Sequence, residues 1–288
     1  MYTPVFAQPP KSWRDWWCAV REFAAGWHDI APGEVRGYHP EADSLGRQLG
    51  VSLSPSVHEW AAFAADLHQA GVFRQALRDR FTLGWDTTIE AATLLTLCEG
   101  DVCWGIPREH LADEDPPVDN WLLDPTGGRP PRWWRRHTPT TSQFALQHLI
   151  GYLHPAAGGF TVHLPPSPEL VERLRSLGRT SIDLGGQVLI EDDDLVIMAG
   201  KSPWTPDEET DITVEVQIGA SRIDSIPQLL VDLARRGGGF FHSTFIGLQG
   251  WLRFCIVSWI TVAAGVCPPC LCRVVAGRVS DSFKAGGG

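Results

Sequence analysis

Hydrophobic residues recur at helical spacing in several stretches of the chain, and polar residues or glycine mark where these stretches begin and end. Ser54 followed by Pro55 is a strong helix start, because the hydroxyl caps free N–H groups and proline has no N–H to lose. Ser56 with Glu59 offers a second capping register for the same helix. Gly50 can supply the left-handed residue that ends a helix. Thr140 and Gln143 fit a capping box. The predicted helices cover residues 12–27, 40–50, 55–70, 141–153, 168–177 and 225–236.

Shorter stretches are rich in β-branched and aliphatic residues or alternate between apolar and polar residues, as strands do. Residues 88–97 and 102–106 flank the turn cluster Glu99-Gly100-Asp101, so they predict a β-hairpin. Residues 211–218 alternate cleanly, which predicts a half-buried antiparallel strand. The other predicted strands are 160–164, 187–190 and 195–199, with a further one around Trp133-Trp134.

These elements predict an α+β protein with a mixed, mostly antiparallel sheet on which helices pack. Residues 1–34 are expected to form an N-terminal packing helix with a tryptophan-rich stripe, and residues 35–155 the α+β core. Residues 156–242 either complete the first sheet or form a small second α+β lobe. Residues 243–288 are an atypical apolar, cysteine-rich tail.

The acidic residues are concentrated in the body of the chain. The 288 residues include 24 basic and 34 acidic ones, a net charge of −10, and only Asp281 is acidic beyond His242. An acidic body argues against nucleic acid or anionic lipid as a partner, and it suits a basic protein such as a nuclease. The alternative interpretation is that the acidic surface only keeps the protein soluble.

Four sequence marks follow one another in the predicted core. They are Glu41-Ala-Asp-Ser-Leu45-Gly46, Leu53-Ser-Pro-Ser-Val-His-Glu-Trp-Ala-Ala-Phe63, Trp104-Gly105-Ile106 and Asp115-Pro-Pro-Val118. Their order resembles the SUKH superfamily of the Smi/Knr type, over roughly residues 35–155. One departure is that the helical pattern runs on through residues 72–80, where the family normally has a loop near an Asn-Gly pair.

The resemblance implies binding rather than chemistry, because bacterial members are mostly interpreted as immunity proteins against secreted toxins. The chain would then neutralise a cognate protein toxin, such as a basic nuclease, by covering its active site. The alternatives are a scaffold or regulatory protein of the same fold without a toxin partner, and an enzyme with a distributed active site. The two prolines of Asp115-Pro-Pro-Val118 predict a stiff exposed connection or an edge. The expected contact residues lie on this segment and at the tryptophans beside it: Trp104, Asp115, Pro116, Pro117, Val118 and Trp121. The alternative is that Trp104 is a core residue and that the prolines only end a strand.

No local motif predicts a catalytic residue, a cofactor or a metal. The chain lacks the phosphate-binding, dinucleotide-binding and nucleophile-elbow signatures, and its histidines are never spaced as in a zinc protease. The four acids from Glu191 to Asp194 lack the alternating ligands and central glycine of a calcium loop, so they predict a solvated turn. Cys267-Pro-Pro-Cys270 lacks the second ligand pair of a structural zinc site.

The remaining features concern location and the tail. Seven cysteines without a framework pattern, and a start without a signal peptide, favour the cytoplasm. Residues 254–266 carry no charge, but the surrounding apolar stretch is interrupted at Gly250 and Arg253. A membrane span needs about 20 apolar residues. The tail is therefore interpreted as a weak membrane anchor, an extra buried element, or non-native and disordered sequence from a frame shift near residues 241–243.

Overall fold

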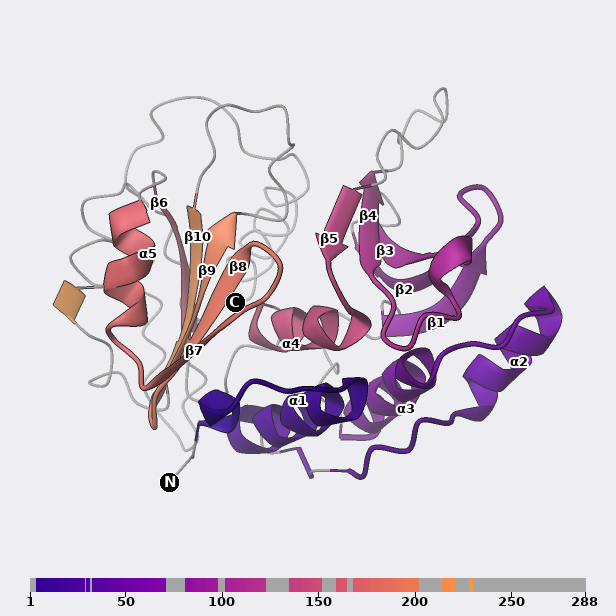
Figure 1. The fold of residues 1–288 in the computed structure, drawn as a ribbon, viewed down its shortest axis with the longest axis horizontal. Coiled ribbons are helices and arrows are strands. Elements are labelled where there is room, and N and C mark those ends of the chain that lie inside the picture. Colours follow the sequence, from indigo (N-terminus) through magenta and orange to yellow (C-terminus); the bar gives the residue numbers. More distant parts are fainter. Residues whose placement is uncertain are drawn as a thin grey trace, which may run out of the picture. The chain divides into compact units, whose positions relative to one another are not determined.

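The computed structural model describes residues 4–28, 30–31, 33–70, 81–97, 102–122, 135–151, 159–164, 168–201, 214–220 and 228–229. The chain divides into two units, 1–256 and 257–288, and every described residue belongs to the first. This unit combines helices with two antiparallel sheets, so the predicted α+β class is confirmed (Figure 1). The helical run at 72–80, the strand at 133–134 and the tail lie outside the described residues, as does nearly all of the helix at 225–236.

The first sheet follows the order of the chain. Its neighbours pair antiparallel in the order β1-β2-β3-β4-β5. The predicted hairpin is β2 with β3, but Thr88 lies in the preceding turn, where Asp86 Oδ1 accepts its backbone N–H at 2.8 Å. The strand before that turn was not predicted from the sequence. The bounds are β1 (Phe81–Asp86), β2 (Ala91–Leu97), β3 (Val102–Pro107), β4 (Val118–Leu122) and β5 (Arg135–Thr138).

The later strands form a sheet of their own rather than extending the first one. Their spatial order is β6-β10-β9-β8-β7, again with antiparallel neighbours. The bounds are β6 (Gly159–Leu164), β7 (Thr180–Asp183), β8 (Gln187–Glu191), β9 (Leu195–Lys201) and β10 (Val214–Ala220), with α5 (Pro168–Arg175) between β6 and β7. The predicted strands at 160–164, 187–190 and 195–199 are confirmed, whereas β7 was not predicted.

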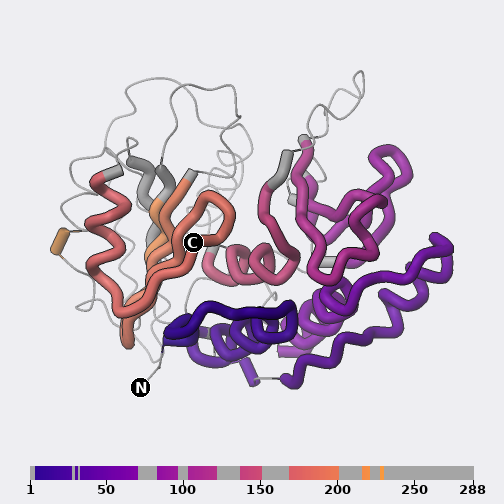
Figure 2. Tube along the Cα trace, in the orientation of Figure 1, coloured from indigo at the N-terminus to yellow at the C-terminus, as the bar shows by residue number. Residues whose placement is uncertain are grey.

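The helices that precede and follow the first sheet pack against one another. They are α1 (Trp13–His28), α2 (Pro40–Leu49), α3 (Pro55–Ala70) and α4 (Thr141–Gly151), with short 3₁₀ turns η1 (Val5–Ala7) and η3 (Arg108–His110). Helix α1 contacts both α3 and α4, although about 100 residues separate α1 from α4 along the chain (Figure 2). A shared apolar core joins these helices to the sheet through Trp17, Trp60, Trp104 and Phe144.

Helix α4 is buried on every side from Thr141 to Ile150. It contacts α1, α3, β5 and β10. Gln147 Nε2 donates to the Leu184 carbonyl at 2.9 Å, and Phe6 N donates to Glu191 Oε2 at 3.0 Å, so polar contacts also tie the helices to the second sheet. Most buried polar groups in proteins have a hydrogen-bond partner, and Gln147 Nε2 finds its partner in the second sheet's β7–β8 connection.

The capping residues predicted from the sequence are found at the ends of α2, α3 and α4. Val57 N donates to Ser54 Oγ at 3.3 Å, and Gln143 N donates to Thr140 Oγ1 at 3.2 Å. Gly50 has φ +68°, in the left-handed region, and its N–H bonds back to the helix. These caps satisfy groups that every helix leaves without an intrahelical partner.

Candidate functional site

The six residues expected to contact a partner do not form one surface. The indoles of Trp104 and Trp121 are each 1% exposed. In the β3–β4 register, Trp104 is opposite Asn120, whereas Trp121 is opposite Cys103. Because successive residues of a strand point to opposite faces, the two indoles lie on opposite sides of the sheet. Trp104 belongs to the helix-facing core, and Trp121 packs with Ile89, Ala91 and Cys103.

The Asp115–Val118 segment is hydrogen-bonded to helices α3 and α4 and is not presented for contact with a partner. The carboxylate of Asp115 accepts hydrogen bonds from Ser56 Oγ at 2.5 Å, Ser142 Oγ at 2.5 Å and Ser142 N at 3.2 Å. Thr141 Oγ1 donates to the Pro116 carbonyl at 2.8 Å. Pro116, Pro117 and Val118 are buried and Asp115 is half-buried. The prediction that this connection is exposed is therefore wrong. The segment instead links β4 to α3 and α4 through these hydrogen bonds.

Burial changes the acidity of this junction. Loss of solvent around Asp115 raises the pKa of its carboxyl, while the hydrogen bonds from Ser142 and Ser56 act in the opposite direction. Trp17 Nε1 donates to Ser56 Oγ at 2.7 Å, so α1 joins the same network. The arrangement holds three helices and the loop before β4 together.

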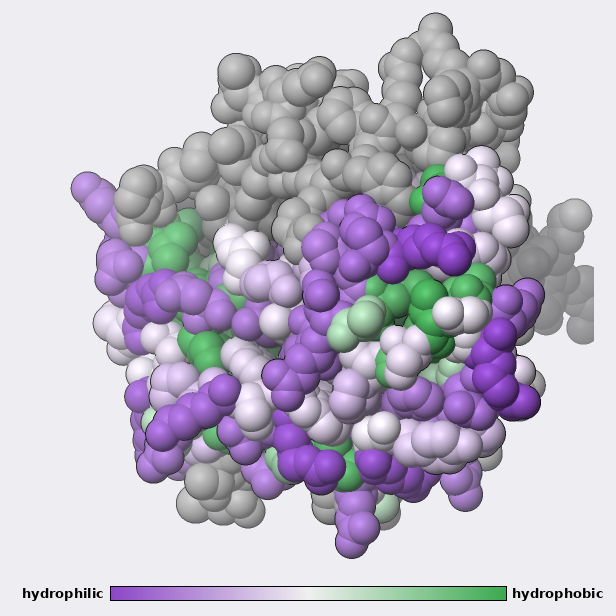
Figure 3. Space-filling model, turned by 45° about the vertical axis from the view of Figure 1, so that its right-hand side comes forward, coloured by the Kyte–Doolittle hydropathy of each residue, from purple (hydrophilic) through white to green (hydrophobic). Residues whose placement is uncertain are grey.

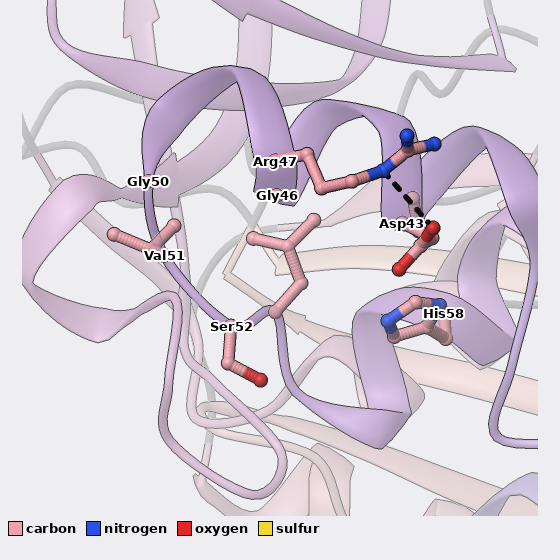
Figure 4. Close-up of a pocket in the computed structure, with 9 residues that line it drawn as sticks. Asp43, Gly46, Arg47, Gly50, Val51, Ser52 and His58 are labelled. Atoms are coloured by element: carbon pink, nitrogen blue, oxygen red, sulfur yellow. Dashed lines mark ion pairs between the residues drawn. The ribbon is translucent and has the colours of Figure 1, made fainter.

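The described residues do form a pocket elsewhere, between α2 and α3. It is a shallow depression of about 320 Å³ that is widely open to solvent. Figure 4 shows the ion pair of Asp43 and Arg47 on one side, with His58 near Asp43 and with Val51 and Ser52 across the opening. The Asp43–Arg47 distance is 3.3 Å and both side chains are well exposed, at 44% and 74%. An ion pair so exposed is weak enough to exchange its partners.

Tyr38 stands close to this pocket because its ring stacks on the imidazole of His58. The ring centroids are 5.5 Å apart and the planes differ by 18°. Tyr38 is 57% exposed, and it is the one large hydrophobic side chain that is exposed in the part of the chain that the structure describes. Among the coloured residues in Figure 3, hydrophilic and intermediate side chains predominate, and hydrophobic areas lie between them, the widest toward the right. The sequence signal that could have indicated this site is an aromatic residue between Gly37 and Pro40.

The pocket places a serine, a histidine and an aspartate together, but not as a catalytic triad. His58 Nδ1 lies 3.0 Å from the backbone nitrogen of His39 and 3.2 Å from the His39 carbonyl oxygen, so it faces backbone and not the aspartate. A triad needs Nδ1–H directed at the aspartate and Nε2 free to accept the serine proton. Asp43 and Ser52 are also not hydrogen-bonded to His58. His58 therefore lacks the contacts to a serine and an aspartate that define a triad.

The acidic turn at 191–194 differs in part from the predicted solvated turn. Asp192, Asp193 and Asp194 lie at the tip between β8 and β9, and Arg179 pairs with the first two at 3.1 Å and 2.8 Å. Glu191, however, is buried at 1% exposure and accepts the Phe6 N–H. Within the described residues, no group of three or more His, Cys, Asp or Glu side chains is arranged to hold a metal ion.

Comparison with known proteins adds no relative: no family model, curated protein or solved structure matches the chain. Among the helices in the described ranges, none has the length and apolar character required to cross a membrane.

Proposed function

We propose that this protein is a non-catalytic binding protein and that it contacts its partner through the α2–α3 surface. We define this surface by Tyr38, Asp43, Arg47, Val51, Ser52 and His58. In keeping with the SUKH-like order of its sequence marks, the partner is a cognate toxin that the protein neutralises by covering the active site. The Asp115–Val118 segment is hydrogen-bonded to α3 and α4 and does not take part in contact.

The exposure of Tyr38 is the observation that carries this proposal. Tyrosine and arginine are enriched among the side chains that dominate binding energy at protein interfaces. Tyr38 and Arg47 are both exposed on this surface, and the stack on His58 holds the tyrosine ring before any partner arrives. A rigid aromatic ring loses little conformational entropy on binding.

The charge of the chain supports a basic partner. The net charge is −10, and the acidic excess lies in the first 242 residues. Complementary charge raises the association rate and disfavours partners of the same sign. A toxin that acts on nucleic acid has a basic surface, so its charge is opposite to that of an acidic immunity protein.

Co-expression with the toxin domain encoded beside the gene tests the proposal. The wild-type protein should restore growth and should co-elute with the toxin, and Tyr38→Ala should weaken the complex by about tenfold to a hundredfold, as loss of a hot-spot residue does. Tyr38→Phe keeps the ring and serves as the matched control. A Tyr38→Ala variant that binds and protects as the wild type does would contradict the assignment of this surface.

The neighbouring gene also separates this function from its alternatives. A stable complex with a cellular protein and no protection from any adjacent toxin would favour a scaffold of the same fold. Turnover of a substrate by the purified protein would favour an enzyme.

A further inference from the structure

We infer that Glu59 is a positioning residue of the α2–α3 surface: it holds the segment from Arg36 to His39 in the conformation that presents Tyr38. The inference rests on the proposed function. Glu59 itself is fully buried on α3, so its role is exerted through the segment and not by contact with a partner.

One oxygen of the Glu59 carboxylate binds two consecutive backbone groups of this segment. Oε2 accepts the N–H of Arg36 at 2.7 Å and the N–H of Gly37 at 3.0 Å. Successive backbone N–H groups that converge on one anion define a fixed turn, and bonds to an ionised acceptor are stronger than neutral ones. Gly37 has φ +61°, in the left-handed region, which only glycine adopts without strain.

The other oxygen of the carboxylate fixes how the side chain is aimed. Arg21 Nε donates to Glu59 Oε1 at 2.6 Å, and Arg21 Nη2 lies 2.5 Å from the same oxygen. Arg21 Nη1 also pairs with Asp66 Oδ2 at 2.8 Å. Arg21 is only 3% exposed, so both of its partners are needed to compensate for burying its charge. The pair turns Oε1 toward α1 and leaves Oε2 directed at the segment.

The residue before Glu59 completes the attachment. His58 Nδ1 accepts the N–H of His39, and the His58 ring supports the ring of Tyr38. Two neighbouring residues of α3 therefore bind three backbone N–H groups on both sides of Tyr38. The segment loses its conformational entropy when the protein folds, so ordering it does not weaken partner binding.

A purely stabilising role explains this network poorly. A buried ion pair often contributes no more stability than well-packed apolar residues of the same volume, because both charges lose their water. The two bonds from Oε2 are made to the backbone of the residues just before Tyr38, so they bear on the position of Tyr38.

The first test measures amide exchange in the free protein. Glu59→Gln keeps the size of the side chain but removes its charge, so the amides of Arg36 and Gly37 should exchange about tenfold faster or more. Amides of the second sheet should keep their protection. Unchanged exchange at Arg36 and Gly37 in a folded Glu59→Gln variant would overturn the inference.

A second variant reaches the segment without disturbing the buried charges. Gly37→Ala places a Cβ at φ +61°, at 3.0 Å from Trp13 Cη2, and should also loosen the segment. Gly186→Ala is the matched control, because Gly186 also has a positive φ but lies between β7 and β8. Equal exchange at Arg36 in the Gly37→Ala variant and in the wild type would count against the inference, even if Glu59→Gln failed to fold.

The second test measures affinity for the toxin domain in a double-mutant cycle. Glu59→Gln or Gly37→Ala should weaken binding about tenfold when Tyr38 is present and much less in the Tyr38→Ala background. A loss of equal size in both backgrounds would show a structural role only and overturn the inference. The proposed function fails separately, when Tyr38→Ala alone leaves the affinity unchanged.

Discussion

Ser142 donates both its backbone N–H and its hydroxyl to the carboxylate of Asp115, at 3.2 Å and 2.5 Å. Asp115 precedes β4, and Ser142 lies in the first turn of the buried helix α4. This contact therefore caps α4 from a distant loop and fixes the first sheet against the helices.

Removal of the Asp115 carboxylate should destabilise the protein. Asp115→Ala loses three accepted hydrogen bonds and leaves Ser56 and Ser142 without this partner, which should lower the free energy of unfolding by about 2–4 kcal/mol. Urea denaturation followed by circular dichroism measures the change. Glu114→Gln, an exposed change in the same loop, is the control and should alter the midpoint little. A midpoint that shifts equally in both variants would contradict a specific role for Asp115.

The same carboxyl should give a pH dependence of known sign. Burial raises the pKa of Asp115 in the folded state above its unfolded value of 3.8, so the folded protein binds a proton more readily than the unfolded chain. Its contribution to stability is fully present below the unfolded pKa and is lost as the pH rises through the folded pKa. The stability of the wild type relative to Asp115→Asn should therefore fall with rising pH, in unfolding experiments from about pH 4 upward. A difference that grows with pH would reverse this sign.

His148 should act in the opposite direction. Its complete burial lowers the pKa from 6.5 to about 3, while its Nδ1 lies 2.9 Å from the Phe144 carbonyl. Stability from this group is present above the unfolded pKa and is lost as the pH falls. Relative to His148→Asn, the wild type should lose about 1.4 kcal/mol per pH unit below about pH 6.5. His110→Asn, at a partly exposed histidine, is the control. A flat difference between wild type and His148→Asn would show that this histidine does not titrate as its burial requires.

A methyl group at Gly105 should disrupt the first sheet. A Cβ there would lie 2.4 Å from the Ala92 carbonyl oxygen and 3.0 Å from Trp121 Cη2. Neither a strand backbone nor a buried indole moves away cheaply, so Gly105→Ala should cost about 3 kcal/mol or more in unfolding free energy. Gly186→Ala meets nothing within 4 Å and should cost only about 1–2 kcal/mol for its positive φ. Thermal melts of the two variants give the comparison, and equal losses would contradict it.

The tail prediction from the sequence stays a prediction, because residues 243–288 lie outside the described part of the chain. Truncation after His242 should leave a soluble protein with an unchanged cooperative melting transition, since composition, charge and cysteine usage all change at that point. Scanning calorimetry and size-exclusion chromatography measure the outcome. Aggregation, or a much lower melting temperature, would show that the tail is a structural element of the native protein.

Local chemistry was sufficient to predict most elements of this fold. The helices at α2, α3 and α4 have caps at Gly50, Ser54 and Thr140, and these residues act on groups at most four positions away. Alternation in β10 and the turn between β2 and β3 are equally local signals. Where the signal was short, the prediction failed: β7 has four residues, and β1 pairs irregularly between Phe81 and Gly84.

The sequence by itself thus determined the α+β class, the capped ends of α2, α3 and α4, and the acidic character of the chain. The predicted helix 168–177 ends earlier, at Arg175. It could not determine which side chains are buried together, because that depends on partners far away in the sequence. The sequence predicted that Trp104 and Trp121 share one surface, but the strand register places them on opposite faces of the sheet. Glu59 is buried because Arg21 and the N–H groups of Arg36 and Gly37 meet it there. A charge leaves water only when the folded chain supplies its partners, and only the tertiary structure decides which residues those are.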